Sequence, residues 1–218
     1  VARTRLEEAP RVRHTDFYLA LVNGGDWKST EEVYGQIRWA KEKAPEEGIR
    51  FIKYLGVYQL RRGLWRERLD WALEALEATP AERADVAYLC NEIGLVYSNL
   101  GDRQQALSYY ERALPIMEEM GDRSELARTL NNIGRVHHNL GDRQQALSYY
   151  ESAMLIWEEV GYRAGQAATL NNIGGVFDNL GDRRQALSYY ERALPITEEV
   201  GDRSGLAATL NNIGMVYH

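Results

Sequence analysis

Hydrophobic and small residues recur along most of the chain at spacings of three and four, which is the period of an amphipathic α-helix. The segment 127–140 shows this pattern, with its row at Ala127, Leu130, Ile133, Gly134 and Leu140. Gly141 and Asp142 follow, and together they favour a break, because glycine can end one helix and aspartate can cap the next. The pattern predicts one helix ending at Leu140 and a second helix beginning at Arg143.

The second segment of this block has its own apolar row, at Ala146, Leu147, Tyr150, Ala153, Met154 and Trp157. Gly161 ends it, and no alternating strand pattern lies between the two helical segments. A helix pair of this length cannot bury its apolar rows alone, so neighbouring pairs must stack on one another. The sequence therefore predicts an all-α protein, an α-solenoid of stacked antiparallel helix pairs.

The helix pairs repeat with a period of 40 residues. The stretch TLNNIG occurs at 129–134, 169–174 and 209–214, and a looser copy, YLCNEIG, covers 88–94. Two asparagines and a glycine cost a helix roughly 2 kcal/mol relative to alanine, so the stretch needs a reason other than helix formation. We expect the glycine of each copy to allow a close approach between helices.

Upstream of these copies the pattern weakens but persists. The segment 54–76 predicts a helix pair that turns at Gly63 and places Gly56 38 residues before Gly94. The segment 14–44 predicts a further pair around two adjacent glycines. No linker separates these segments from the regular repeats.

The repeat register gives the expected domain organisation. Residues 1–80 form two degenerate helix pairs, and residues 81–218 form three regular pairs and a final unpaired first helix, all in one continuous solenoid. That last helix leaves Leu210, Ile213 and Tyr217 with an apolar row to cover. Head-to-tail stacking of chains through this helix, giving a homo-oligomer, is therefore one hypothesis for the function.

The repeats resemble the tetratricopeptide repeat (TPR). That family's pattern is followed by Leu170-x2-Ile173-Gly174-x2-Phe177 and then Ala186-x3-Tyr190 and Ala193, with Leu for the usual Trp and Ile for the usual Leu. The period of 40 exceeds the family's 34 and implies longer helices. Pro115 and Pro195 fall inside second helices, where proline is expected to cause a kink. The resemblance implies a right-handed superhelix whose first helices line a concave groove.

The variant LNNIG…GDxxxALxYYExAL resembles in particular the repeats of kinesin light chain and of the sensor arms of bacterial STAND-type signalling ATPases. The segment 14–44 is similar to the first helices after the nucleotide-binding module of STAND proteins. The chain has no G-x4-GK[ST] loop, so any ATPase module would lie outside it. The resemblance implies a protein- or peptide-binding scaffold, the sensor arm of a larger bacterial signalling protein.

The composition of the chain limits the classes of partner that it can bind. The net charge of −6, with both signs interspersed, argues against nucleic acid, because phosphate binding needs a concentrated basic face. No apolar run approaches the ~20 residues of a membrane span. The single cysteine, Cys90, excludes an internal disulfide framework and suits a reducing, cytoplasmic location. We expect it to be a small core residue.

The chain offers few groups for catalysis. It contains no G-x-S-x-G, H-E-x-x-H or paired-cysteine motif. His137 and His138 are adjacent on a helix, so their side chains diverge by about 100° and are poorly placed to share a metal. We expect no enzyme activity, no cofactor and no metal site.

The first helices carry the residues expected to bind a ligand. Their face opposite the apolar row holds asparagine in every copy, whereas the neighbouring residues change from apolar to basic to small or acidic. A carboxamide offers one acceptor and two donors, so a row of asparagines can pair with an extended peptide backbone, as the resemblance to kinesin light chain implies. The residues predicted to line the groove are Tyr88, Asn91, Leu95, Asn99, Arg128, Asn131, Arg135, His138, Asn139, Asn171, Asp178, Asn179 and Asn211.

The asparagines have an alternative role, which is to bridge neighbouring repeats. We expect groove contact for the first asparagine of each pair and a place between repeats for the second, at Asn132, Asn172 and Asn212, because adjacent helical residues point about 100° apart. Arg128, Arg135 and His138 together would favour an acidic stretch in the ligand.

Overall fold

The computed structural model describes residues 34–35, 37–38, 48–78 and 83–217. Every regular element in these residues is an α-helix, and they include no β-strand. The chain divides into two compact units, Val1–Asp102 and Arg103–His218. The all-α prediction is confirmed, whereas the division at residue 80 and the single continuous solenoid stay predictions.

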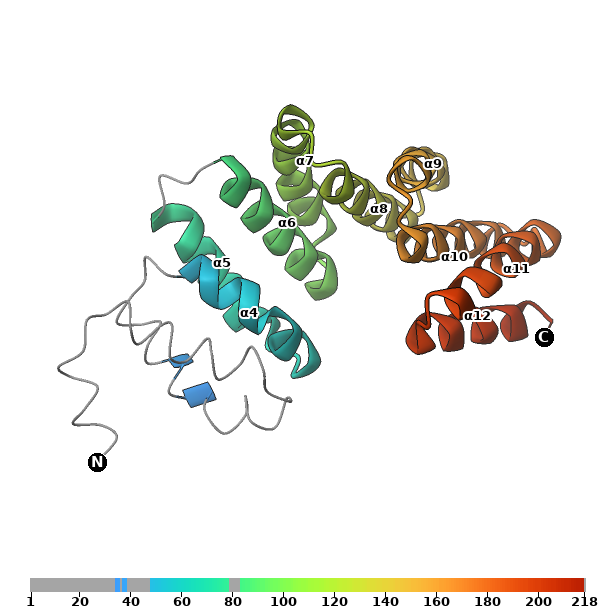
Figure 1. Ribbon diagram of the computed structural model, residues 1–218, viewed down its shortest axis with the longest axis horizontal. Helices are drawn as coiled ribbons and strands as arrows, with labels where there is room; N and C mark the ends of the chain where they lie inside the picture. Colours follow the sequence, from blue (N-terminus) through green and yellow to red (C-terminus); the bar gives the residue numbers. More distant parts are fainter. Residues whose placement is uncertain (1–33, 36, 39–47, 79–82, 218) are drawn as a thin grey trace. The chain divides into compact units, whose positions relative to one another are not determined.

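The first unit contains α4 (Gly48–Arg61), α5 (Trp65–Ala78) and α6 (Arg83–Leu100), and α5 packs against both of the others (Figure 1). The chain turns between α4 and α5 at Gly63, whose φ of 67° lies in the left-handed region. The predicted helix pair around this glycine is therefore confirmed. The pair predicted at 14–44 lies outside the described residues apart from positions 34, 35, 37 and 38.

A buried arginine links the three helices of the first unit. Arg68 on α5 is 2% exposed and forms an ion pair with Glu92 on α6. Its Nη1 donates a hydrogen bond of 3.3 Å to Oε1 of Gln59 on α4. Burial lowers the pKa of Arg68, because a buried cation loses its hydration. The regular repeats have alanine at this position, as at Ala106, so the periodic pattern did not indicate this polar link.

The second unit contains helices of 14 to 18 residues. They are α7 (Arg103–Met120), α8 (Arg123–Leu140), α9 (Arg143–Val160), α10 (Arg163–Asn179), α11 (Arg183–Glu199) and α12 (Arg203–Val216). The pairs α8–α9 and α10–α11 make the most extensive contacts, and each helix also packs against the next along the chain (Figure 1). The first helices α8, α10 and α12 contact one another in that order. These contacts confirm the predicted stack of helix pairs in this unit.

The turns between helices have the predicted chemistry. Gly141 follows α8 with φ 84°, and its N–H donates to the carbonyls of His137 and His138. Asp142 then begins the next helix, where its carboxylate accepts a hydrogen bond of 3.2 Å from the backbone N–H of Gln145. The capping aspartate and the left-handed glycine predicted at this turn are confirmed.

Tyrosine and glycine pack together inside each complete pair of this unit. A Cβ built on Gly134 would lie 2.7 Å from Cδ1 of Tyr150, and one on Gly174 would lie 2.5 Å from Cε1 of Tyr190. Such distances are far below van der Waals contact, so these glycines allow the close approach that their repetition predicted. Gly214 on α12 has nothing within 4 Å of the same position.

The apolar row of α8 differs from the prediction at one end. Leu140 is 49% exposed rather than buried, because it lies in the last turn of the helix where the neighbouring helices no longer cover it. Val136, one turn earlier, is fully buried instead, together with Ala127 and Ile133. The prediction for Leu140 was wrong.

Candidate functional site

The predicted groove residues of the first unit lie on α6. Tyr88 is half-buried, and the ammonium nitrogen of Lys53 lies 5.1 Å from the centre of its ring. Asn99 is exposed, and its side chain donates a hydrogen bond of 2.7 Å to the carbonyl of Leu95. Asn91, by contrast, is only 7% exposed. Tyr88, Leu95 and Asn99 are therefore more exposed than Asn91.

In the second unit the first asparagine of TLNNIG contacts the next repeat. Oδ1 of Asn131 on α8 accepts a hydrogen bond of 3.1 Å from Thr169 Oγ1 on α10. The same oxygen accepts one of 3.1 Å from Nδ2 of Asn172, which is the second asparagine of the following copy. Asn172 therefore lies at the joint between repeats, as expected, and Asn131 lies there with it.

Asn171 makes the equivalent link one repeat further on. Its Nδ2 donates a hydrogen bond of 2.8 Å to Oγ1 of Thr209 on α12, and this hydroxyl in turn donates to the carbonyl of Gly205 at 2.8 Å. Asn211, on the last copy, is exposed. The hydrogen bonds of Asn131 and Asn171 thus match the alternative role, in which the asparagines bridge neighbouring repeats. Groove contact by these residues stays a prediction.

Arg135 on α8 lies beside two tyrosines of the second helices, Tyr110 on α7 and Tyr150 on α9. Both tyrosines are 0% exposed. Among the described residues, neither hydroxyl forms a hydrogen bond of ordinary geometry, and neither do Nε and Nη2 of Arg135, although the Tyr110 hydroxyl interacts with Arg135. Burial raises the pKa of Tyr110 to about 12, against the opposing effect of the Arg135 charge. A positive charge and two hydroxyl groups therefore lie together with unused hydrogen-bonding capacity.

His138, one turn beyond Arg135, reaches from α8 to α10. Its Nε2 is 2.6 Å from Nδ2 of Asn179. Because an amide nitrogen only donates, Nε2 is the acceptor and the neutral ring carries its proton on Nδ1. Burial and the charge of Arg143 both lower the pKa of His138, which favours this neutral form. The contact joins two of the predicted groove residues.

Gly175 takes the place of Arg135 in the next repeat. A Cβ built there would lie 3.5 Å from Cε1 of His138 and 3.8 Å from the hydroxyl oxygen of Tyr190. Burial, reinforced by the negative charge of Asp178, raises the pKa of Tyr190 to about 12. We call the side of the second unit formed by α8, α10 and α12 the first-helix face. In chain order it carries the guanidinium of Arg135, the imidazole of His138, the glycine at position 175 and the carboxylate of Asp178.

Arg128 lies apart from this group. Its guanidinium pairs with the carboxylate of Glu125 at 2.8 Å, and its side chain is 59% exposed. Two helical turns, about 10 Å, separate it from Arg135 on the same helix. Asn139 is exposed at the end of α8. Of the groove residues predicted on α8 and α10, the structure brings His138 and Asn179 into contact, whereas Arg128 is paired with Glu125.

The sequence analysis missed the threonine of TLNNIG. Thr129, Thr169 and Thr209 are all 0% exposed. Each hydroxyl oxygen lies 2.8 to 2.9 Å from the carbonyl oxygen four residues earlier in its own helix. At Thr169 this carbonyl and Oδ1 of Asn131 share the one hydroxyl proton. The threonine recurs with the same period as the asparagine, and this shared period was the signal that could have identified it as the asparagine's partner.

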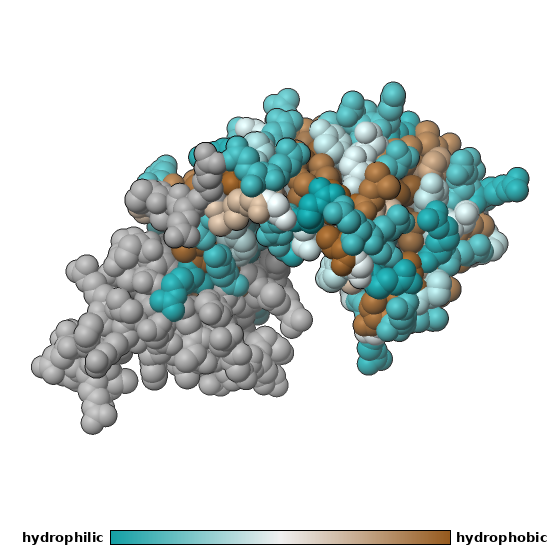
Figure 2. Space-filling view, turned by 45° about the horizontal axis from the view of Figure 1, so that its top comes forward, coloured by the Kyte–Doolittle hydropathy of each residue, from teal (hydrophilic) through white to brown (hydrophobic). Residues whose placement is uncertain are grey.

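The opposite side of the second unit has a hollow of about 470 Å³ between α9, α10 and α11. It is lined in part by Met154, Leu170, Arg192 and Pro195, and none of the predicted groove residues lines it. The hollow also has charged and polar walls, at Glu158, Arg163, Gln166 and Glu191. Leu155 on α9 is 67% exposed. Figure 2 shows hydrophobic residues interspersed with hydrophilic ones on the face that it draws.

Among residues 34–35, 37–38, 48–78 and 83–217, no helix is long and apolar enough to cross a membrane. The same residues contain no cluster of three or more histidine, cysteine, aspartate or glutamate side chains suited to hold a metal ion.

The 40-residue repeat forms stacked helix pairs in which a tyrosine of one helix packs on a glycine of the other. This architecture is that of helical-repeat proteins, which offer extended binding surfaces. The sequence matches the tetratricopeptide repeat family over residues 82–159, 125–199 and 166–218, which together cover more than half of the chain. The chain belongs to the tetratricopeptide repeat family. No curated protein matches the sequence.

Solved structures with low sequence identity share the fold. The apo form of RapI is 16% identical with a TM-score of 0.79, over 95% of this chain and 77% of that one. A Rap protein complexed with competence and sporulation factor is 19% identical with a TM-score of 0.69, over 78% of this chain and 48% of that one. A putative kinesin light chain of Podosopora anserina with nearly identical TPR-like repeats is 14% identical with a TM-score of 0.60, over 78% of this chain and 86% of that one. The fold is typical of protein-binding scaffolds.

Proposed function

We propose that the first-helix face of the second unit binds an extended segment of a partner protein. The supporting observation is that constant and variable positions of the repeats have different roles. Positions that are identical in all three TLNNIG copies hold the repeats together, whereas positions that differ between copies, such as Arg135 and Gly175, face the same side without an architectural partner. Variable side chains on a constant framework are what selective recognition of a segment requires.

The chemistry of this face defines what the segment would contain. His138 and Asn179 present a polar pair that can exchange hydrogen bonds with a peptide backbone. Arg135 adds a positive charge, which favours an acidic residue in the partner. Each neutral hydrogen bond contributes only about 0.5–1.5 kcal/mol, so affinity comes from several such contacts along the stack and from this charged anchor.

The proposed biological setting rests on the sequence resemblance to STAND-type sensor arms. In such a cytoplasmic signalling protein, capture of a segment along the repeats would alter the contacts of the arm with an ATPase module. The Rap protein complexed with competence and sporulation factor is a structural relative that has been solved with a bound factor. A regulatory binding arm is consistent with the absence of any catalytic motif from the sequence.

The test is a peptide library screened against the chain, followed by affinity measurements on the selected peptides. The double variant His138→Ala with Asp178→Ala removes two variable side chains from the first-helix face. The matched control, Glu151→Ala with Ser188→Ala, removes two exposed side chains from the second helices. We expect the first variant to weaken binding at least tenfold and the control to leave it unchanged. Equal effects of the two variants would refute the proposed binding face.

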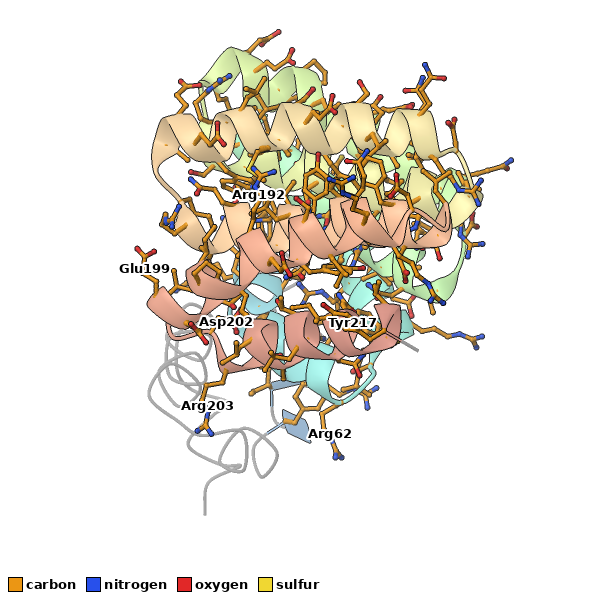
Figure 3. All side chains as sticks on the ribbon, turned by 90° about the vertical axis from the view of Figure 1, so that its right-hand side faces the viewer. Arg62, Arg192, Glu199, Asp202, Arg203 and Tyr217 are labelled. Atoms are coloured by element: carbon orange, nitrogen blue, oxygen red, sulfur yellow. The ribbon has the colours of Figure 1, made fainter. Side chains whose placement is uncertain are left out.

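Self-assembly is the second candidate, and the exposure of α12 is the observation that favours it. Leu210 is 51% exposed, whereas its counterpart Leu170 is 3% exposed because α11 covers it. Tyr217 is 70% exposed at the far end of the same helix from Asp202, as Figure 3 shows. A second copy covering this face would make the molar mass depend on concentration, and Leu210→Glu would abolish that dependence. A constant monomer mass in light scattering would exclude this candidate.

A further inference from the structure

We infer that Arg135 and the hydroxyl groups of Tyr110 and Tyr150 form a subsite for a carboxylate group of the bound segment. This inference rests on the proposed function and specifies its anchor. The subsite joins three consecutive helices, because Tyr110 lies on α7, Arg135 on α8 and Tyr150 on α9. Its ligand is the side-chain or terminal carboxylate of the partner.

The unused hydrogen-bond donors carry the argument. Nε and Nη2 of Arg135 and both tyrosine hydroxyls are buried, and none forms a hydrogen bond of ordinary geometry among the described residues. The Tyr110 hydroxyl interacts only with Arg135 itself. Buried polar groups in folded proteins are almost always paired, so a group of buried polar atoms that has no partner outside the group calls for an explanation. A carboxylate oxygen accepts several hydrogen bonds at once and would satisfy these donors together.

The surrounding packing holds the two hydroxyls in place. The ring of Tyr150 lies against Gly134, directly beside Arg135 in the chain, and it packs on Ile173 and Val176 of α10. A buried ring in such contacts cannot swing away to satisfy its hydroxyl in water. The Tyr150 hydroxyl is therefore held in position before any ligand arrives.

Arg135 is the mobile part of the subsite. Its side chain is half-buried and reaches the surface, in contrast to the fully buried tyrosines. A carboxylate entering from the first-helix face meets the guanidinium first, and rotation of its outer torsions turns the Nε and Nη2 edge towards the ligand. That edge is the one that pairs with both oxygens of a carboxylate.

The charge balance favours a carboxylate over a more highly charged anion. One guanidinium supplies one positive charge, and His138, one turn further along α8, accepts a hydrogen bond from Asn179 as a neutral ring. The equivalent positions in the other copies are Leu95, Gly175 and Met215, none of which carries charge. The subsite therefore occurs once along the repeats and would fix the register of the bound segment.

The first arm of the test reads the subsite without a peptide. Glutarate and inorganic phosphate are titrated separately into the chain while the side-chain Nε–Hε signals of arginine are followed by NMR, with the Arg135 signal assigned by its loss in Arg135→Met. We expect glutarate to shift this signal saturably and phosphate to shift it less. No shift with glutarate, or an equal shift with phosphate, would overturn the inference.

The second arm compares hexaglutamate with hexaglutamine by calorimetry. Arg135→Met follows the methionine that this chain has at position 215, and Arg112→Met on α7 removes the same charge from an exposed site. We expect hexaglutamate to bind more tightly than hexaglutamine, Arg135→Met to weaken it at least tenfold, and Arg112→Met to weaken it less than twofold. Tyr150→Phe, which keeps the ring, should weaken it several-fold. Equal losses for the two arginine variants would show a non-specific charge effect and overturn the inference.

The two arms also separate this inference from the proposed function. If library peptides bind the first-helix face but ignore Arg135→Met, the binding function stands and the carboxylate subsite is overturned. If glutarate shifts the Arg135 signal and no peptide binds, the subsite stands and the proposed function fails.

Discussion

Alanine in place of Gly174 tests the packing on which the whole stack depends. The added methyl group would lie 2.5 Å from Cε1 and 2.7 Å from Cδ1 of Tyr190. Tyr190 is 2% exposed and packs on Ala186 and Val216, so its ring cannot withdraw without opening the contact between α11 and α12. Overpacking of this kind costs about 1–3 kcal/mol. Alanine's better helix propensity returns about 1 kcal/mol, which leaves a net loss of up to about 2 kcal/mol.

The matched control for Gly174→Ala is Gly214→Ala, in the last copy of the same TLNNIG stretch. A Cβ on Gly214 meets nothing within 4 Å, so this variant gains helix propensity without a clash. Urea denaturation followed by circular dichroism gives the unfolding free energy, and amide hydrogen exchange reads α12 separately. We expect the two variants to differ by about 1–3 kcal/mol, with Gly174→Ala the less stable. Equal stabilities would refute the packing argument.

A double-mutant cycle isolates the contact itself. In a Tyr190→Ala background the methyl group of Gly174→Ala has space, so its penalty should vanish and only the gain in helix propensity should remain. A penalty that persists without the tyrosine ring would show that the cost arises elsewhere.

Three further predictions concern hydrogen bonds and charges. Asn171→Ala should lower the unfolding free energy by about 1 kcal/mol through loss of its bond to the next repeat, whereas Asn211→Ala should change it by less than about 0.5 kcal/mol; urea denaturation compares them. The pKa of Tyr110 is about 12 in the folded chain and about 10 when unfolded, so the unfolded state loses its proton first and stability falls as pH rises between these values. Tyr110→Phe should therefore make the decline in melting temperature above pH 10 shallower. Arg68→Met should destabilise α4 to α6 by up to about 3 kcal/mol by leaving the partly buried carboxylate of Glu92 unpaired, and the exposed neighbour Arg66→Met should be nearly neutral by hydrogen exchange.

The helix pairs could be predicted from the sequence because their signals are local. Gly141 and Asp142 form a complete stop-and-start signal within two residues, and the structure uses both as predicted. The period of 40 then places every copy in the same frame, so one correctly interpreted turn determines the others. Periodicity does not predict burial correctly at a helix end that the neighbouring helices no longer cover. For this reason Leu140 fits the apolar row but is exposed.

The candidate site was predicted less completely because its contacts link different repeats. Helical geometry indicates which way Asn131 points, but it does not show that Thr169 lies within hydrogen-bonding distance 38 residues later. The buried tyrosines were predicted as packing rings, and this is confirmed, but their unpaired hydroxyls depend on which residue occupies position 135 of the adjacent helix. Arg68 was missed for a related reason, since its partners come from two other helices.

The central claim is that a partner segment lies along the first helices of the second unit. Backbone chemical-shift mapping with a library-selected peptide tests it most directly. The account predicts that shifts concentrate at Arg135, His138 and Gly175 on α8 and α10, and that Leu155 and Arg192 on the second helices stay unchanged. Shifts confined to the second helices would contradict it.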